Sequence, residues 1–392
     1  MAEFLRKHTL PVVACVVALI SMLFVPPSAA YLDYFDFRTL SCLFCISASV
    51  NALVGTGVFD RLAQRIVRTL KTQRACVAAL VGITLVAAMF ITNYMALLTF
   101  LPLSFLVLNE TTRDKKILPW CFVLQNAAAV LGGMILPFGN PHNLYLYNLH
   151  SIPTPTFILT MLPTFATAVA LIAVGCIIVK PAPLVLPDRL ADTGTSFARN
   201  AKTWESVDEE AGGLPGRTPT GTVHKVIYFA LFALTLGAIL HVIPYQAALV
   251  IVLATLLVCN RWVLARVDYG LLVTFAAFFV FAGNMSSIPS VESFVVGMLQ
   301  HNELLTTVLT CQVISNLPTT LLLAPFTGNW PTLLVATDIA GMGTPIASLA
   351  SLITIKAFMG YRRADTGLFM RMFLAVGFGM LAVLYLVASL TL

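Results

Sequence analysis

Long apolar stretches, separated by short polar ones, run through the whole chain. They fall at about residues 10–30, 37–58, 76–108, 118–149, 156–180, 223–243, 245–265, 269–287, 294–326, 331–360 and 367–391. About 20 apolar residues are enough for one helix to cross a bilayer core of roughly 30 Å. The pattern predicts an all-α polytopic membrane protein, with 10–30 as a transmembrane helix rather than a cleaved signal peptide.

Two of these stretches are much longer than one crossing needs, and each has a polar pair in its interior. Residues 76–108 contain Thr92 and Asn93, and residues 294–326 contain Ser315 and Asn316. Non-helical backbone at membrane depth is tolerated only where protein or a cavity shelters it. We therefore predict that each stretch is a re-entrant helical hairpin whose tip lies near the membrane midplane.

The stretch that follows each hairpin carries glycine and proline in its interior. Residues 136–147 read LPFGNPHNLYLY, and residues 341–353 read GMGTPIASLASLI. Glycine and proline break a transmembrane helix into half-helices. We predict a broken helix over 118–149 and another over 331–360.

Composition and charge agree with a membrane protein and orient it. Hydrophobic residues make up 59% of the chain and charged residues only 10%, whereas soluble domains are about a quarter charged. If both hairpins enter and leave on one side, the basic clusters all fall on the side of the N-terminus, and positive residues favour the cytoplasm. The clusters are Arg61, Arg65, Arg68, Lys71 and Arg74; Arg113, Lys115 and Lys116; Arg261 and Arg266; and Lys356, Arg362 and Arg363.

This charge distribution predicts nine spanning helices plus two hairpins in the cytoplasmic membrane. The N-terminus is then cytoplasmic and the C-terminus lies outside. The net charge of +6 is spread over short clusters between apolar segments, which does not favour nucleic-acid binding.

The order of the stretches predicts two inverted repeats. The first repeat is 1–180, residues 181–222 form a polar cytoplasmic linker, residues 223–244 form a connecting transmembrane helix, and the second repeat is 245–392. The single connecting helix would insert the second repeat in the opposite direction. Inverted repeats with broken helices are typical of secondary transporters.

The tips and breaks offer groups that bind small ions. Half-helix N-termini attract anions, and freed carbonyls with side-chain oxygens suit a small hard cation such as Na+. The candidate substrate- and ion-binding residues are Thr92, Asn93, Gly139, Asn140, His142, Asn143, Ser315, Asn316, Thr319, Gly343, Thr344 and Ser348. Beyond Na+ near Asn93 and Gly139 and near Asn316 and Gly343, we expect no metal and no cofactor.

Two ionisable residues lie at membrane depth, where such groups are costly and usually functional. His142 either carries a proton or binds an anion, or it is a neutral structural histidine. Asp338 is either a proton or cation site, or it is exposed near the outer interface. The sequence has no paired carboxylates, no H-E-x-x-H and no nucleophile beside a base, so we do not expect an enzyme.

The four segments resemble the ion transporter superfamily, in particular its citrate-transporter-like branch, which includes arsenite permeases and dicarboxylate/sodium symporters. TNYMALLTFLPL and SNLPTTLL look like the hairpin tips, while GNPHNL and GTPIASLASLI look like the broken segments. The tips depart from the Ser-Asn-Thr of the dicarboxylate branch, and His142 replaces a common glutamine. The resemblance implies alternating access, usually in a homodimer, with a scaffold domain and a mobile transport domain that holds both hairpins.

The resemblance also implies two half-sites. Thr92, Asn93, Gly139 and Asn140 would form one of them, and Ser315, Asn316, Gly343 and Thr344 the other. The predicted function is therefore a secondary transporter that moves a small anion or carboxylate with Na+ or H+, with membrane lipid as its surroundings. A cation/proton antiporter and an arsenite-type metalloid permease of the same superfamily are the alternatives.

Overall fold

The computed structural model of the chain describes residues 9–59, 61, 65, 70–111, 114–183, 221–360 and 365–392, and regular structure there is helical throughout. Seven helices in this part of the chain are long and apolar enough to cross a membrane. They are α3 (Phe37–Val54), α5 (Gln73–Phe90), α9 (Thr154–Ile177), α12 (Thr222–Ile239), α13 (Tyr245–Leu264), α14 (Tyr269–Ser286) and α19 (Thr366–Thr391). The chain is an all-α integral membrane protein, as predicted.

Both predicted hairpins are interrupted at their polar pairs. In the first, α5 ends at Phe90, two residues intervene, and α6 (Asn93–Thr111) packs back against α5. In the second, α15 (Pro289–Ile314) and α16 (Asn316–Leu323) are separated only by Ser315. The positions of the tips along the chain are confirmed, and their depth in the membrane stays a prediction.

Both predicted broken helices are also present. The first is α7 (Ile117–Gly132) followed, after the loop 133–140, by α8 (Pro141–Leu149). The second is α17 (Trp330–Ile339) followed, after the loop 340–348, by α18 (Leu349–Met359). Gly343 lies in that loop with φ 110°, in the left-handed region that glycine adopts without steric cost.

The order of elements is repeated. Among the described residues, each half contains two helices, a hairpin, a broken helix and a final helix, and α12 lies between the halves. The second helix of each half is capped by an aspartate: Asp36 Oδ1 accepts from Thr39 N at 3.0 Å in α3, and Asp268 Oδ1 accepts from Leu271 N at 2.8 Å in α14. The same cap at equivalent places supports two structural repeats, while their opposite insertion stays a prediction.

The first helix is shorter than the pattern predicted. Helix α2 (Thr9–Ser21) ends well before residue 30, and η1 (Ala29–Tyr34) forms a separate 3-10 turn. Pro26 and Pro27 lie between them, and proline both lacks the N–H that a helix interior needs and clashes with the preceding turn.

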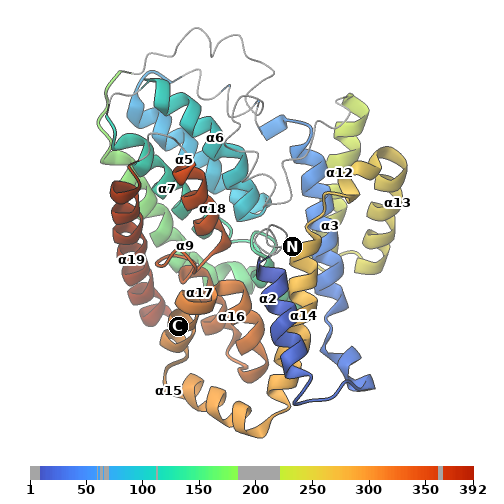
Figure 1. Cartoon of the computed structure of the whole chain (residues 1–392). Helices are drawn as coiled ribbons and strands as arrows, with labels where there is room; N and C mark the ends of the chain where they lie inside the picture. The colour runs from blue at the N-terminus through green and yellow to red at the C-terminus, as the bar shows by residue number, and fades with distance from the viewer. Residues whose placement is uncertain are drawn as a thin grey trace. The chain divides into compact units, whose positions relative to one another are not determined.

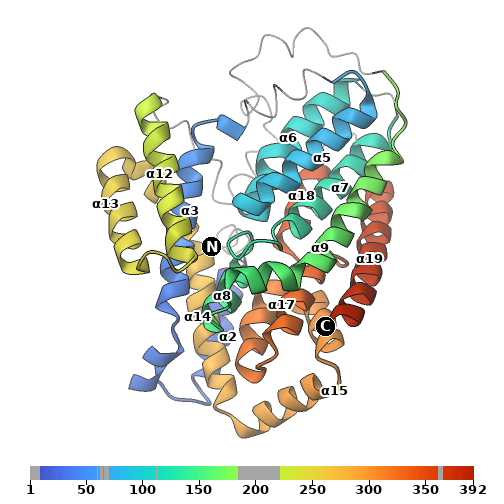
Figure 2. The same cartoon turned by 180° about the vertical axis from the view of Figure 1, so that it is seen from behind.

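The chain divides into two compact units, each discontinuous in sequence. The first unit consists of Met1–Thr56, Pro141–Phe157 and Gly212–Thr337. In it α14 packs on α2, α3 packs on α12 and α13, and α16 packs on α14 and α8. The three helices α3, α12 and α13 lie side by side in both views (Figures 1 and 2).

The second unit consists of Gly57–Asn140, Ile158–Ala211 and Asp338–Leu392. Helices α5, α6 and α7 pack on one another, α18 packs on α6 and α7, and α19 packs on α7. Asn126 of α7 ties α18 in place, because its Nδ2 donates to Ser351 Oγ at 3.3 Å and its Oδ1 accepts from Thr354 Oγ1 at 3.1 Å. The ring of Phe358 also stacks on that of Phe369, with centroids 4.1 Å apart.

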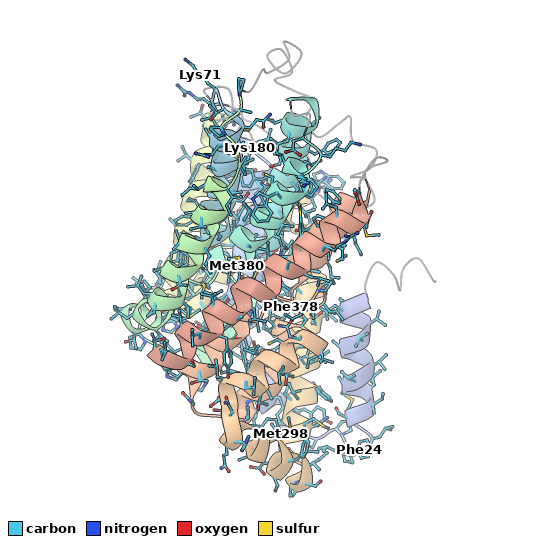
Figure 3. All side chains as sticks on the ribbon, turned by 90° about the vertical axis from the view of Figure 1, so that its left-hand side faces the viewer. Phe24, Lys71, Lys180, Met298, Phe378 and Met380 are labelled. Atoms are coloured by element: carbon cyan, nitrogen blue, oxygen red, sulfur yellow. The ribbon has the colours of Figure 1, made fainter. Side chains whose placement is uncertain are left out.

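The basic segment that includes Lys71 and Arg74 meets the end of the apolar stretch 156–180 in this unit. Arg74 Nε donates to the carbonyl of Val179 at 2.7 Å. Lys71 and Lys180 lie at the same end of the unit (Figure 3). Their common end agrees with the predicted topology within this unit, while its cytoplasmic location stays a prediction. Most of the predicted linker 181–222, from residue 184 to 220, lies outside the described residues.

Candidate functional site

The first hairpin tip, in the second unit, is a buried break between two helices, and an asparagine begins the second of them. Asn93 begins α6, is 8% exposed, and its Oδ1 accepts from the N–H of Tyr94 at 2.8 Å. Thr92 is equally buried; its carbonyl accepts from Ala96 N at 3.0 Å, and its hydroxyl has no hydrogen-bond partner. The tip therefore presents an unpartnered oxygen beside a helix N-terminus.

The second tip, in the first unit, has the same asparagine device on a strained backbone. Asn316 Oδ1 accepts from Leu317 N at 2.9 Å. Ser315 has φ 76° and ψ 156°, a conformation that costs a non-glycine residue about 1–3 kcal/mol. Thr319 holds it there, because its N–H and its hydroxyl both donate to the Ser315 carbonyl, at 3.2 and 2.7 Å. Strain that is held by its surroundings is typical of functional sites.

Helix α8 packs against α16 within the first unit. Its first turn carries His142, 2% exposed, and Asn143, which has no exposed surface. Neither Asn143 Oδ1 nor its Nδ2 has a hydrogen-bond partner. Leaving a buried polar group unsatisfied costs about 1–3 kcal/mol, so Asn143 is a second place where a ligand or water would be stabilised.

The first break, in the second unit, is packed too tightly for any residue but glycine. A Cβ on Gly139 would lie 2.3 Å from the carbonyl oxygen of Gly133, and a Cβ on Gly133 would lie 2.6 Å from Asn140 Oδ1. Gly133 was missed by the sequence analysis. The Gly132-Gly133 pair inside a long apolar stretch was the signal that could have found it.

Asn140 and Asp338 are hydrogen-bonded to each other within the second unit. Asn140 Nδ2 donates to Asp338 Oδ1 at 2.7 Å, and each residue is 1% exposed. The alternative that Asp338 is exposed near the outer interface is therefore wrong. A carboxylate that is buried in this way is stable in its charged form only with hydrogen-bonding or cationic neighbours.

The second break adds close backbone packing and a helix cap. A Cβ on Gly377 of α19 would lie 3.0 Å from the carbonyl of Gly343. The carbonyl of half-buried Thr344 accepts from Ala347 N at 3.2 Å. Ser348, 1% exposed, caps α18 through its hydroxyl, which accepts from Ala350 N at 3.2 Å.

The two compact units do not correspond to the two predicted half-sites. Thr92, Asn93, Gly139 and Asn140 all belong to the second unit, together with Asp338, Gly343, Thr344 and Ser348. His142, Asn143, Ser315, Asn316 and Thr319 belong to the first. The hairpins are thus in different compact units, and both the pairing of the half-sites and the shared transport domain stay predictions.

Comparisons with known proteins point to transport. The family model described as "Citrate transporter" matches residues 4–330. The chain is 26% identical over 353 residues to "Uncharacterized transporter MJ0456" of Methanocaldococcus jannaschii, covering 90% of this chain and 88% of that one. It is also 26% identical over 340 residues to "Inner membrane protein YbiR" of Escherichia coli, covering 85% and 82%.

Among solved structures, the Alcanivorax borkumensis YdaH transporter, whose topology is described as unusual, aligns with 99% of this chain and 98% of its own. The TM-score is 0.43 and the identity 11%, a likeness too weak to support an argument about the fold. The matched family and the M. jannaschii relative are transporters, not enzymes, in agreement with the sequence analysis.

Proposed function

Since the chain belongs to the citrate transporter family, we propose that it is a secondary active transporter for a small anion or carboxylate. It would work by alternating access in the cytoplasmic membrane, with Na+ or H+ as the coupling ion. In this proposal the N-terminus is cytoplasmic, the C-terminus is outside, and the protein is a lipid-embedded homodimer.

The observation that carries the proposal is the same arrangement of an asparagine at both tips. Asn93 and Asn316 each begin a helix and each accept from the next backbone N–H. The N–H groups of a helix N-terminus and its partial positive charge favour an anion. Residues 91–102 and 314–326 contain no Asp, Glu, Lys or Arg, so these tips would meet an anion with backbone dipoles, hydroxyls and bound cations.

Citrate is the first substrate to test, because the family description names it. The test is a panel of small anions, each added to the purified protein with Na+ or with choline, followed by thermal unfolding. A ligand at 100 times its dissociation constant stabilises the native state by about 2.7 kcal/mol. Anions that stabilise the protein would then be assayed for uptake into proteoliposomes under an imposed Na+ or pH gradient.

Saturable, gradient-driven uptake of one of these anions is the expected result. The panel includes arsenite, so that a metalloid permease would be recognised by arsenite movement without carboxylate uptake. If no carboxylate or inorganic anion stabilises the protein or accumulates in the vesicles, the proposal is wrong.

A further inference from the structure

The polar cluster around Asn140 in the second unit has a chemistry of its own, separate from the hairpin tips. It brings together the amide of Asn140, the carboxyl of Asp338 and the backbone of Gly133. Asn140 and Asp338 are each 1% exposed. The cluster is therefore shielded from bulk water, and its hydrogen bonds must be accounted for within the protein or by a ligand.

The orientation of the Asn140 amide is set by its partner. Its Nδ2 faces Asp338 Oδ1 at 2.7 Å, which is the arrangement that a carboxylate acceptor requires. The other end of the amide, Oδ1, packs at Gly133 and has no hydrogen-bond partner. A buried acceptor without a hydrogen-bond partner is destabilising, and a cation would satisfy it.

The helix ends in the cluster add negative potential. Asp338 lies in the last turn of α17, which ends at Ile339, and Gly133 follows the last residue of α7, Gly132. The last carbonyls of a helix carry partial negative charge. A negatively charged side chain at such an end is disfavoured unless a positive charge is nearby.

We propose that this cluster is a Na+ site, with Asn140 Oδ1 and the Asp338 carboxylate as side-chain ligands and helix-end carbonyls nearby. One carboxylate among neutral oxygens suits a monovalent ion better than Ca2+, whose sites use several carboxylates. This site differs from the Na+ binding predicted near the tips, because it includes Asp338 of the second broken helix and no residue of either hairpin. Only its use as the coupling site rests on the proposed transport function; the binding itself does not.

The test is thermal unfolding of the purified full-length protein without any transport substrate. NaCl is titrated against choline chloride at constant ionic strength, at one fixed pH and again at a lower pH. Wild type is expected to show a saturable rise in unfolding temperature with Na+. Asp338→Asn is expected to lose that rise, or to need at least about tenfold more Na+.

Asp365→Asn is the matched control, with the same chemical change in the same unit. Asp365 is exposed and caps α19 by accepting from Leu368 N at 2.9 Å, and asparagine caps helices about as well as aspartate. This variant is expected to keep the wild-type response to Na+.

Two further variants keep the proposal falsifiable if Asp338→Asn does not fold. Gly133→Ala places a Cβ 2.6 Å from Asn140 Oδ1, which would displace the amide and weaken Na+ binding at least about tenfold while the carboxyl remains. The double variant Asn140→Asp with Asp338→Asn exchanges the two groups and is expected to recover Na+ binding.

The proposal is overturned if wild type gains no stability from Na+, or if Asp338→Asn or Gly133→Ala responds as wild type does. It is also overturned if stability changes with pH but not with Na+ at fixed pH, which would make Asp338 a proton carrier only. Substrate uptake can still be measured separately in each of these cases. A missing Na+ site is therefore distinguishable from a missing transport function.

Discussion

The two hairpin tips both interrupt a helix at an asparagine, but their backbone conformations differ. Both use an asparagine that begins a helix and accepts the next backbone N–H, at 2.8 Å for Asn93 and 2.9 Å for Asn316. The residue before Asn316 has φ 76°, whereas the first tip has no residue in the left-handed region. The second tip thus carries backbone strain that the first avoids.

The two units also differ in how their interrupted segments are held. Ser315 is held by two hydrogen bonds from Thr319 in its own hairpin. The first tip shares its unit with the break at Gly139, where the glycine backbone meets that of Gly133 too closely for a side chain. One unit therefore relies on a strained residue fixed by hydrogen bonds, and the other on close backbone packing.

The largest effect is expected where the tips are alike. Asn93→Ala and Asn316→Ala each remove a side-chain oxygen at the tip and the acceptor of the next backbone N–H. We expect uptake to fall by about 10- to 100-fold in each, with normal membrane insertion. Gradient-driven uptake by proteoliposomes measures this, and Asn329→Ala is the control, since Asn329 precedes α17 and bonds Thr332 at 2.9 Å outside both tips. Full activity of both tip variants would remove the proposed site.

The second effect concerns the support in the second unit. Gly139→Ala would force a Cβ to within 2.3 Å of the Gly133 carbonyl, and backbone cannot yield as a flexible side chain does. We expect a loss of about 1–3 kcal/mol in the free energy of unfolding. Gly82→Ala on α5 meets nothing within 4 Å and should gain about 0.5–1 kcal/mol. Equal thermal stability of the two variants would contradict the role of close packing.

The third effect is a difference in thermal stability that reflects the backbone strain at Ser315. Ser315→Gly relieves the strained backbone, which offsets the extra flexibility of glycine in the unfolded chain. Its thermal stability should match or exceed that of wild type by up to about 1 kcal/mol. Thr92→Gly has no strain to relieve and should lose about 0.5–1 kcal/mol. Similar losses in both would show that Ser315 stores no strain.

The smallest effect compares the caps at the starts of the repeats. Asp268→Asn should change stability by a few tenths of a kcal/mol, because asparagine is also a good cap. Asp36→Asn should cost about 0.5–1.5 kcal/mol, since Asp36 Oδ2 also accepts from the Thr39 hydroxyl. Denaturant unfolding of the two variants gives the difference, and an equal small effect would mean that the second hydrogen bond contributes little.

Much of the fold was predictable because membrane length and polar interruptions leave few choices. A polar pair or a Gly-x-Pro inside an apolar run marks where backbone must leave the helix, and all four breaks lie at such residues. The end of α2 was mispredicted because residues 22–30 are apolar enough to continue the helix, while Pro26 and Pro27 prevent it.

The site was predictable only as a list of residues. The hydrogen bond between Asn140 and Asp338 joins residues 198 positions apart, and one sequence contains no measure of such proximity. The importance of Gly133 depends on the distance from its backbone to Gly139. The strain at Ser315 is a dihedral angle, which a serine beside an asparagine does not reveal.

The side-chain link between α7 and α18 also has a consequence for how the protein is made. Asn126 and Ser351 are 225 residues apart, and ribosomes add about 5–20 residues per second. For roughly 10 to 45 seconds of synthesis, the amide of Asn126 exists without either of its partners on α18. During that interval the nascent first hairpin and α7 depend on one another, on water or on the insertion machinery, so slowed translation between these helices should prolong exposure to membrane proteases.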